Sequence, residues 1–316
     1  MMQVFVLEYL SGGGLVDGDA QATQLLMPQG LAMRDALVAD LLASGDCEVT
    51  AATCAHAGAL PCGAAEAAAR DGETLEAFAA RVAAEHDAAW IVAPETGGCL
   101  AAFERAVGAP RWLGCDARSI AIASSKSATL RHLVAHDVPT PWSCAAGAQR
   151  WVVKPDDGAG GVATRVHANR LGAEADLAAR VARGQSACLE PWVDGEAMSL
   201  SLLCELGQAE LLSVNRQRIV ALQDGHLRYD GVAIDVLPRS SARWRPLAAL
   251  ASRVAAALPG LRGFVGVDIV AGGRHGPVVI EVNPRLTCAY VGLSARLRRN
   301  LARDVLALQR LERIDA

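Results

Sequence analysis

The stretch "WVVKPDDGAGG", residues 151–161, joins a short apolar run to a glycine-rich loop. Lys154 ends the apolar run, and glycines follow it at positions 158, 160 and 161. The chain has 30 basic residues, and only one other of them, Lys126, is a lysine, which leaves 28 arginines (30 minus 2). Because glycine lets backbone N–H groups approach a ligand closely, loops of this kind suit phosphate groups.

Three kinds of nucleotide-binding loop are possible interpretations of this stretch. A Walker P-loop is excluded by order, because its lysine follows the glycines, whereas Lys154 precedes them. The spacing Gly158, Gly160, Ala163 fits the Rossmann pattern GxGxxA, but that mechanism needs a helix directly after the loop. The next residues, "VATRVHA" (162–168), are alternating and β-branched, which predicts a strand. We therefore expect a β-hairpin that folds over a triphosphate, and the Rossmann interpretation stays as an alternative.

Length and composition describe a globular chain. At 316 residues, with 52% hydrophobic and 20% charged residues, it is long enough for two or three structural units. The net charge of −4 argues against a nucleic-acid or anionic-membrane binder, which needs a basic surface. We expect no nucleic-acid or membrane partner, and the sequence leaves a homodimer open.

The cysteines and the N-terminus indicate a cytoplasmic protein. The nine cysteines are odd in number, none has CxxC spacing, and most lie in apolar runs, which is typical of reduced thiols. The start of the sequence, "MMQVFVLEYLSGGG", lacks the basic segment of a signal peptide.

Strands and helices alternate in the first third of the chain, which predicts a parallel sheet covered by helices. We expect strands at 3–10, 47–53 and 88–94, and helices at 21–44, 73–86 and 96–107; residues 64–69 are expected to be helix or loop. Further along we expect helices at 125–136, 173–183, 242–257 and 290–313, and strands at 150–155, 162–168, 187–193, 197–206, 209–220, 226–237, 264–270 and 278–283. The fold class is therefore α/β, with α+β units after residue 112.

Two acids lie inside otherwise apolar strands, "VGVDIV" and "VVIEVNPR", where an unpaired charge is costly. Glu281 and Asn283 are two residues apart, so they share one face of their strand. A turn at residues 273–276 would place Asp268 opposite Glu281, although a slip of one residue is left open. Oxygen ligands of this kind, completed by phosphates, suit Mg²⁺ in an ATP enzyme. A buried acid–arginine ion pair without metal is the alternative.

With these features the sequence resembles the ATP-grasp superfamily, over about residues 110–313. That family has one lysine at the start of a helix and a second on the strand before the glycine loop, and Lys126 and Lys154 stand at those positions. A compact ammonium acts as a point charge on phosphate oxygens, a slot that the planar fork of arginine does not fit. The resemblance implies a pre-ATP-grasp domain at 1–112, a subdomain with a glycine-rich lid at 113–193 and a C-terminal subdomain with the metal site at 194–316.

The resemblance also implies roles for individual residues. In "LEPWVDGEAMSLS" (189–201), Glu190 or Glu196 would meet the ribose, and the backbone of Trp192 and Val193 the adenine. Asp268, Glu281 and Asn283 would hold Mg²⁺, or Mn²⁺ in its place, and Arg285 would reach the γ-phosphate or an acyl-phosphate. The implied catalytic residues are Arg285, Lys154 and Asn283, and the implied ATP-binding residues are Lys126, Lys154, Gly158, Gly160, Gly161, Glu190, Trp192, Val193 and Glu196.

Three short motifs are similar to the tyramine–glutamate ligase group, which makes a γ-glutamyl amide of methanofuran-type cofactors. They are "VLEYLSGGG" (6–14), "SVNRQRI" (213–219) and "NPRLTCAYVGL" (283–293). The family usually has two threonines in the last motif, whereas Cys288 follows Thr287 here. The resemblance implies an ATP-dependent ligase that joins glutamate to tyramine or tyrosine through an acyl-phosphate.

The same resemblance implies a substrate site formed by Tyr9, Ser11, Gly12, Asn215 and Tyr290, besides Arg285. For Tyr9 and Tyr290, packing in the core is an equally good interpretation. Alternation places Asn215 and Gln217 on one strand face and Arg216 and Arg218 on the other, and a solvated edge strand explains these four residues nearly as well. Alternative functions are a D-alanine–D-alanine-type or other amino-acid ligase, a non-catalytic ATP-binding protein and a Rossmann oxidoreductase.

Overall fold

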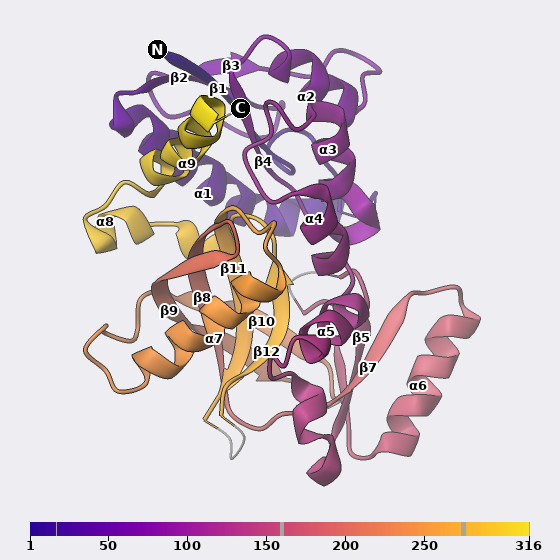
Figure 1. Cartoon of the computed structure of the whole chain (residues 1–316). Coiled ribbons are helices and arrows are strands. Elements are labelled where there is room, and N and C mark those ends of the chain that lie inside the picture. The colour runs from indigo at the N-terminus through magenta and orange to yellow at the C-terminus, as the bar shows by residue number, and fades with distance from the viewer. Residues whose placement is uncertain (17, 159–160, 273–275, 316) are drawn as a thin grey trace.

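A parallel sheet forms the N-terminal part of the chain, at the top of Figure 1. The structure is a computed structural model that describes residues 1–16, 18–158, 161–272 and 276–315. The sheet has the strand order β3-β2-β1-β4, and every neighbouring pair is parallel. Its elements are β1 (Met2–Glu8), α1 (Ala20–Ser44), β2 (Cys47–Ala52), β3 (Ala65–Ala67), α2 (Leu75–Ala83), β4 (Ala88–Val92), η1 (Thr96–Gly98) and α3 (Cys99–Val107).

The edge of this sheet brings two acidic residues together. β1 is apolar along its centre, with Val4 to Leu7 fully buried, and it pairs with β4 in a register that places Glu8 beside Val92. Both strands run in the same direction, so the residues after them lie at one edge. Glu8 and the residue that follows β4 closely, Glu95, are therefore on the side of the sheet that faces the rest of the chain.

The glycine-rich loop joins two strands of a small antiparallel sheet with the order β6-β5-β7. This unit contains α4 (Ala117–Ala123), α5 (Lys126–Ala135), η2 (Pro141–Gly147), β5 (Trp151–Pro155), β6 (Arg165–His167), α6 (Arg170–Ala182) and β7 (Ala187–Pro191). The chain after Gly161 enters β6 and not a helix, so the Rossmann alternative is wrong and the predicted hairpin is confirmed.

A five-stranded antiparallel sheet, of order β10-β9-β8-β11-β12, forms the C-terminal unit. Its elements are β8 (Glu196–Glu205), β9 (Gln208–Ala221), β10 (Leu227–Ala233), α7 (Trp244–Ala257), β11 (Gly263–Ala271) and β12 (Val278–Asn283). One face carries Leu200 and Val267 and packs in the same core cluster as Leu250 of α7. The opposite face carries a row of polar residues across four strands: Asn215, Ser199, Asp268 and Glu281.

The C-terminus differs from the prediction of one helix over 290–313. The segment is divided into η3 (Cys288–Tyr290), α8 (Leu293–Leu297) and α9 (Leu301–Asp315). Arg298 adopts a left-handed conformation with φ of 52°, which ends α8, and Asn300 accepts from the Arg303 N–H at 2.9 Å to begin α9. The Asn300 amide also donates to the Asp40 carbonyl of α1 at 2.7 Å, which brings α9 back onto the N-terminal unit (Figure 1).

Two further elements were not predicted. Residues 65–67 form β3 at the edge of the N-terminal sheet and not a helix or loop, and α4 precedes the helix that carries Lys126. The mixed α/β fold with a parallel N-terminal sheet is confirmed. Within the described residues, no helix is both long and apolar enough to cross a membrane.

Candidate active site

Lys154 and Glu190 form an ion pair inside the small sheet. Val152 of β5 lies opposite Glu190 of β7, so Lys154, two residues along, shares their face. The Lys154 Nζ lies 2.6 Å from Glu190 Oε1, and both side chains are 5% exposed. Glu190 Oε2 is buried and has no hydrogen-bond partner among the described residues. This oxygen is a free acceptor at the end of a buried ion pair.

The charge of Lys154 is maintained by its neighbours. Burial alone would lower the pKa of Lys154, but the carboxylate of Glu190 acts against it, with smaller effects of Cys188 and Glu281, and the net shift is upward. The ammonium therefore stays protonated although it is buried. Glu281 on β12 therefore adds to the negative charge that keeps this lysine protonated.

Lys126 begins α5 and joins the same group of charges. Ser125 caps the helix by accepting from the Ala128 N–H, and the Lys126 Nζ lies 3.0 Å from Glu281 Oε1. The ammonium also donates to the carbonyl of Gly158, at the start of the glycine loop. Lys126 of α5, Lys154 of β5 and Glu281 of β12 therefore lie in one group of charges, contributed by two units of the fold.

Asp156 ties the lysine helix to the glycine loop. Its carboxylate accepts from the Ser125 hydroxyl at 2.5 Å and from the Ser127 N–H at 2.8 Å, and its backbone carbonyl accepts from the Lys126 N–H at 2.8 Å. The helix that carries Lys126 is thus fixed to Asp156, which lies two residues after Lys154. Gly158 and Gly161 lie in this loop, with Gly161 at a positive φ of 72°, and Gly160 lies outside the described residues.

The metal-ligand candidates have the predicted register. Asp268 of β11 pairs directly with Glu281 of β12, and a bulge follows immediately, so the slip that the sequence left open does not occur at this pair. Asn283 shares the face of Glu281 and hydrogen-bonds Asp268, which also accepts from Gln217 Nε2 at 3.0 Å. The turn residues 273–275 lie outside the described residues.

The two carboxylates repel each other. Burial, together with the charge of Glu281, raises the pKa of Asp268 to about 7. The described residues hold no group of three or more His, Cys, Asp or Glu that could bind a metal without help. Two acids and an amide nevertheless fit Mg²⁺, which takes one or two carboxylates and completes its octahedron with phosphates and water.

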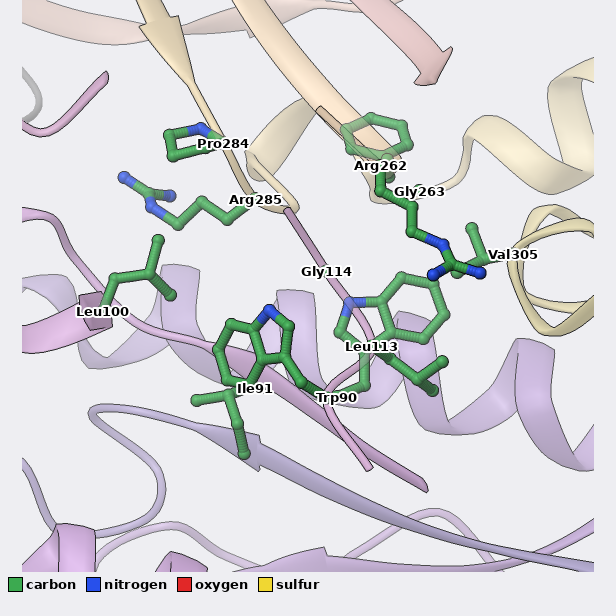
Figure 2. A pocket seen from close by; sticks show the side chains of 12 residues that line it. Trp90, Ile91, Leu100, Leu113, Gly114, Arg262, Gly263, Pro284, Arg285 and Val305 are labelled. Carbon is green, nitrogen blue, oxygen red and sulfur yellow. The ribbon is translucent and has the colours of Figure 1, made fainter. Parts of the chain in front are cut away.

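Arg285 follows this ligand set and points toward the N-terminal unit. Its Nη2 donates to Glu95 Oε2 at 2.8 Å, and its side chain is 13% exposed. Figure 2 shows the stem of Arg285 at the edge of a cavity beside Trp90 and Leu113, and Phe264 also lines this cavity. That cavity has a volume of about 10 Å³, which is room for a single water molecule and not for a substrate.

The hinge residues are partly engaged in other contacts. The Trp192 N–H donates to the Arg150 carbonyl at 3.0 Å, and within the described residues no hydrogen bond is seen at the Trp192 carbonyl or the Val193 backbone. Glu196 is paired through one oxygen with Arg216 Nε at 2.5 Å and through the other with Arg243 Nη2 at 2.9 Å. Glu190, which keeps an unpaired buried oxygen, is the better acceptor of the two acids.

The loop after β1 is folded around Glu8. The carboxylate of Glu8 accepts from the Leu10 and Ser11 N–H groups, and the Glu8 carbonyl accepts from the Ser11 hydroxyl and the Gly12 N–H. Tyr9 is half-buried and its hydroxyl donates to the Leu15 carbonyl at 3.0 Å. Ser11 is fully buried. These three predicted substrate residues therefore shape the loop at the sheet edge.

Two other predicted substrate residues are internal. Tyr290 is 1% exposed, its ring lies edge-on to Phe264, and its hydroxyl donates to Asp40 at 2.6 Å, so the core-packing alternative describes it. Asn215 is also fully buried, and its amide bonds Ser199, Ser201, Ser213 and the Asp235 N–H. The polar groups of both side chains are used inside the protein, and their contact with a substrate stays a prediction.

Sequence reasoning missed three residues of this region. Asp156 stands directly after "KP" and before the glycines. No periodic pattern in the sequence indicates that this acid caps α5. Gln217 was seen on its strand but not as the partner of Asp268. Glu95 ends the apolar run "AAWIVAPE", and its contact with Arg285 spans 190 residues, so only the fold could reveal it.

A protein-family model described as an ATP-grasp domain matches residues 123–289, which is more than half of the chain. The chain belongs to the ATP-grasp family. A second model, the pre ATP-grasp 3 domain, matches residues 47–120. The prediction of an ATP-grasp fold is thereby confirmed.

Solved ATP-grasp structures share the fold. An ATP-grasp superfamily protein from Archaeoglobus fulgidus has 21% identity and a TM-score of 0.70, and the match covers 97% of this chain and 88% of that chain. D-alanine–D-alanine ligase from Bacillus anthracis has 15% identity and a TM-score of 0.65, with coverage of 99% and 100%. L-amino acid ligase from Bacillus licheniformis has 14% identity and a TM-score of 0.67, with coverage of 97% and 73%. No curated protein matches the sequence.

The repulsion at Asp268 predicts a pH-dependent gain in stability when this charge is removed. The folded state binds the Asp268 proton more tightly than the unfolded state does, because the pKa of this carboxyl is raised by folding. The free energy of unfolding therefore falls as the pH rises from about 4 toward 7, where the unfolded state has already lost this proton. At pH 8 with a chelator, Asp268→Asn should melt several degrees above the wild type, and the gap should close below about pH 4. Differential scanning calorimetry measures this, with Asp71→Asn on an exposed loop as the control. A wild type at least as stable as Asp268→Asn at pH 8 would refute the interpretation.

Proposed function

We propose that this ATP-grasp protein is an ADP-forming ligase that joins the γ-carboxyl of L-glutamate to tyramine or tyrosine. The observation that carries the ligase chemistry is the convergence of Lys126, Lys154 and Glu281, with both ammonium groups bound to carboxylates. The two acids, Glu281 and Glu190, neutralise charges that would otherwise be buried without partners. A triphosphate supplies the same negative charge, so it can take over both lysines.

The nucleotide would lie between the glycine loop and the row of acids on β11 and β12. Lys126 and Lys154 would neutralise its phosphates, and the N–H groups around Gly158, Gly160 and Gly161 would cover them. The free Glu190 Oε2 supports a hydrogen bond to the ribose, and the backbone of Trp192 and Val193 would meet the adenine. We propose the functional division 1–112, 113–193 and 194–316 on the same grounds.

Asp268, Glu281 and Asn283 would hold Mg²⁺, which in such enzymes neutralises phosphate charge and orients the transferring group. The raised pKa of Asp268 supports this role, because a divalent cation would remove the repulsion between the two acids. Glu281 also holds Lys126, so the metal ligand and the lysine would adjust together when the nucleotide enters.

The reaction needs no covalent intermediate on the protein. A carboxylate oxygen of the substrate attacks the γ-phosphorus, the bond to ADP breaks, and an acyl-phosphate forms. The nitrogen lone pair of the amine then attacks the acyl carbon, phosphate leaves with the electron pair, and the nitrogen loses a proton. Arg285 and Lys154 would stabilise the negative charge on the transferring group, and Asn283 would fix its orientation. The lid would keep water from the acyl-phosphate.

Several features support the narrower substrate assignment. The motif 6–14 forms the loop at the edge of the N-terminal sheet, and Cys288 of the motif 283–293 is close enough to Glu8 for the Glu8 charge to affect the pKa of Cys288. Arg285 of the motif 283–293 reaches the N-terminal unit through Glu95, and we propose that the glutamate binds on this side of the C-terminal sheet. Biosynthesis of a methanofuran- or methylofuran-type cofactor is the process that this product would serve.

A different amino-acid ligase is the second candidate. The fold neighbours include proteins named as D-alanine–D-alanine ligase and L-amino acid ligase, and both cover this chain almost completely. Under this alternative the nucleotide and metal residues keep their roles, and only the acyl donor and the amine change.

A screen for ADP release distinguishes these substrates. With Mg²⁺ and ATP, we expect release when glutamate is supplied together with tyramine or tyrosine, and none with either substrate omitted or with a chelator present. A coupled ADP assay with mass spectrometry of the amide measures both. Turnover with another acid and amine alone would remove the glutamate assignment and retain the ligase class.

Replacing Lys154 tests the nucleotide site. Lys154→Arg keeps the charge but adds a planar fork where a compact ammonium lies 2.6 Å from Glu190. We expect kcat/KM to fall at least a hundredfold, while the circular dichroism spectrum and melting temperature stay close to those of the wild type. Arg170→Lys, in the exposed pair with Glu174 on α6, is the control and should keep full activity. Normal turnover in Lys154→Arg would contradict the role given to this lysine.

A further inference from the structure

Glu95 and Arg285 form an ion pair across the boundary between the N-terminal unit and the C-terminal sheet. Glu95 follows β4, and Arg285 lies two residues after Asn283, the last residue of β12. The distance from Arg285 Nη2 to Glu95 Oε2 is 2.8 Å, and the side chains are 13% and 6% exposed. The N-terminal unit therefore contributes a direct partner to the arginine beside the metal ligands.

The pair is poorly explained as a stabilising contact. Glu95 Oε1 and Arg285 Nε are both buried, and neither has a hydrogen-bond partner within the described part of the chain. Buried polar atoms without partners are costly, and buried ion pairs often stabilise a fold no better than apolar side chains would. The ion pair has this cost, but it holds the guanidinium of Arg285 in one defined position.

The loop that carries Glu95 also contacts the start of the glycine loop. The Thr96 hydroxyl donates to the Asp157 carbonyl at 3.1 Å, and the Gly97 N–H donates to the Asp157 carboxylate at 3.0 Å. One short segment, residues 95–97, thus binds both Arg285 and the base of the lid. A movement of the lid or of Arg285 would therefore change the contacts of this segment.

We infer that Glu95 is a positioning residue, which holds Arg285 in the orientation required for phosphoryl transfer. The inference rests on the proposed function. Besides Glu95, the described polar partner of the guanidinium is the Leu286 carbonyl, which accepts from Nη1 at 3.2 Å. The residues that line the cavity along the stem of Arg285 include no acid (Figure 2), and Glu281, whose charge also helps to raise the pKa of Arg285, forms no ion pair with it among the residues that the structure describes. Without Glu95, a long flexible side chain beside the reacting atoms would sample several rotamers.

The isosteric variant Glu95→Gln tests this role. We expect kcat to fall at least tenfold, while KM for ATP changes less than twofold, because ATP is bound by other residues and only the transfer step needs the orientation of Arg285. Glu73→Gln, which breaks the ion pair with Arg81 of α2, is the control and should keep the wild-type kcat. A kcat for Glu95→Gln within twofold of the wild type would overturn the inference.

A double-mutant cycle separates positioning from a general structural effect. If Glu95 acts through Arg285, Glu95→Gln should change kcat less than twofold in an Arg285→Gln background. An equal fold-loss in both backgrounds would show that Glu95 acts elsewhere and would contradict the inference.

Measurements on the wild type distinguish a failure of this inference from a failure of the proposed function. A wild type that releases no ADP with any acid and amine would count against the proposed function. In that case, aluminium fluoride, which mimics the transferring phosphoryl group, is used with ADP and Mg²⁺. It should tighten ADP binding to the wild type at least tenfold more than to Glu95→Gln. Equal tightening in both proteins would overturn the role of Glu95.

Discussion

Two buried ammonium groups, on Lys126 and Lys154, each lie against a carboxylate, and the arrangement of the ATP-grasp units depends on these contacts. Burying a charge without a partner costs several kcal/mol, so each lysine requires an acid within a few ångströms. Lys154 meets this need within its own sheet, through Glu190. Lys126 meets it through Glu281, on a different sheet, and so connects the lid unit with the metal-ligand strands.

Acids at the start of the glycine loop extend this connection to the N-terminal unit. Asp156 fixes the loop to the helix of Lys126, and Asp157 fixes it to residues 96 and 97. The neighbouring Glu95 forms an ion pair with Arg285, two residues after Asn283. Nucleotide, metal and substrate would therefore act on one continuous set of charges, in which a change at any ion pair alters its neighbours.

The sequence was sufficient for the features with a local signal. Strand alternation and a short turn predicted that Asp268 faces Glu281, and the order of lysine, glycines and β-branched residues predicted the hairpin lid. Features set by distant contacts were missed. The sequence did not indicate that the Tyr290 hydroxyl donates to Asp40 of α1. It also did not indicate that Glu95 pairs with Arg285, because Arg285 is far along the chain. The break at Arg298 depends on Asn300 binding α1 and left no glycine or proline signal.

A crystal structure with Mg²⁺ and a non-hydrolysable ATP analogue tests the central claim most directly. The account predicts that the Nζ atoms of Lys126 and Lys154 leave Glu281 Oε1 and Glu190 Oε1, or share them, and lie within hydrogen-bond distance of phosphate oxygens. Glu281 should then contact the metal. A structure in which both lysines keep only their carboxylate partners, while the phosphates lie elsewhere, would contradict it.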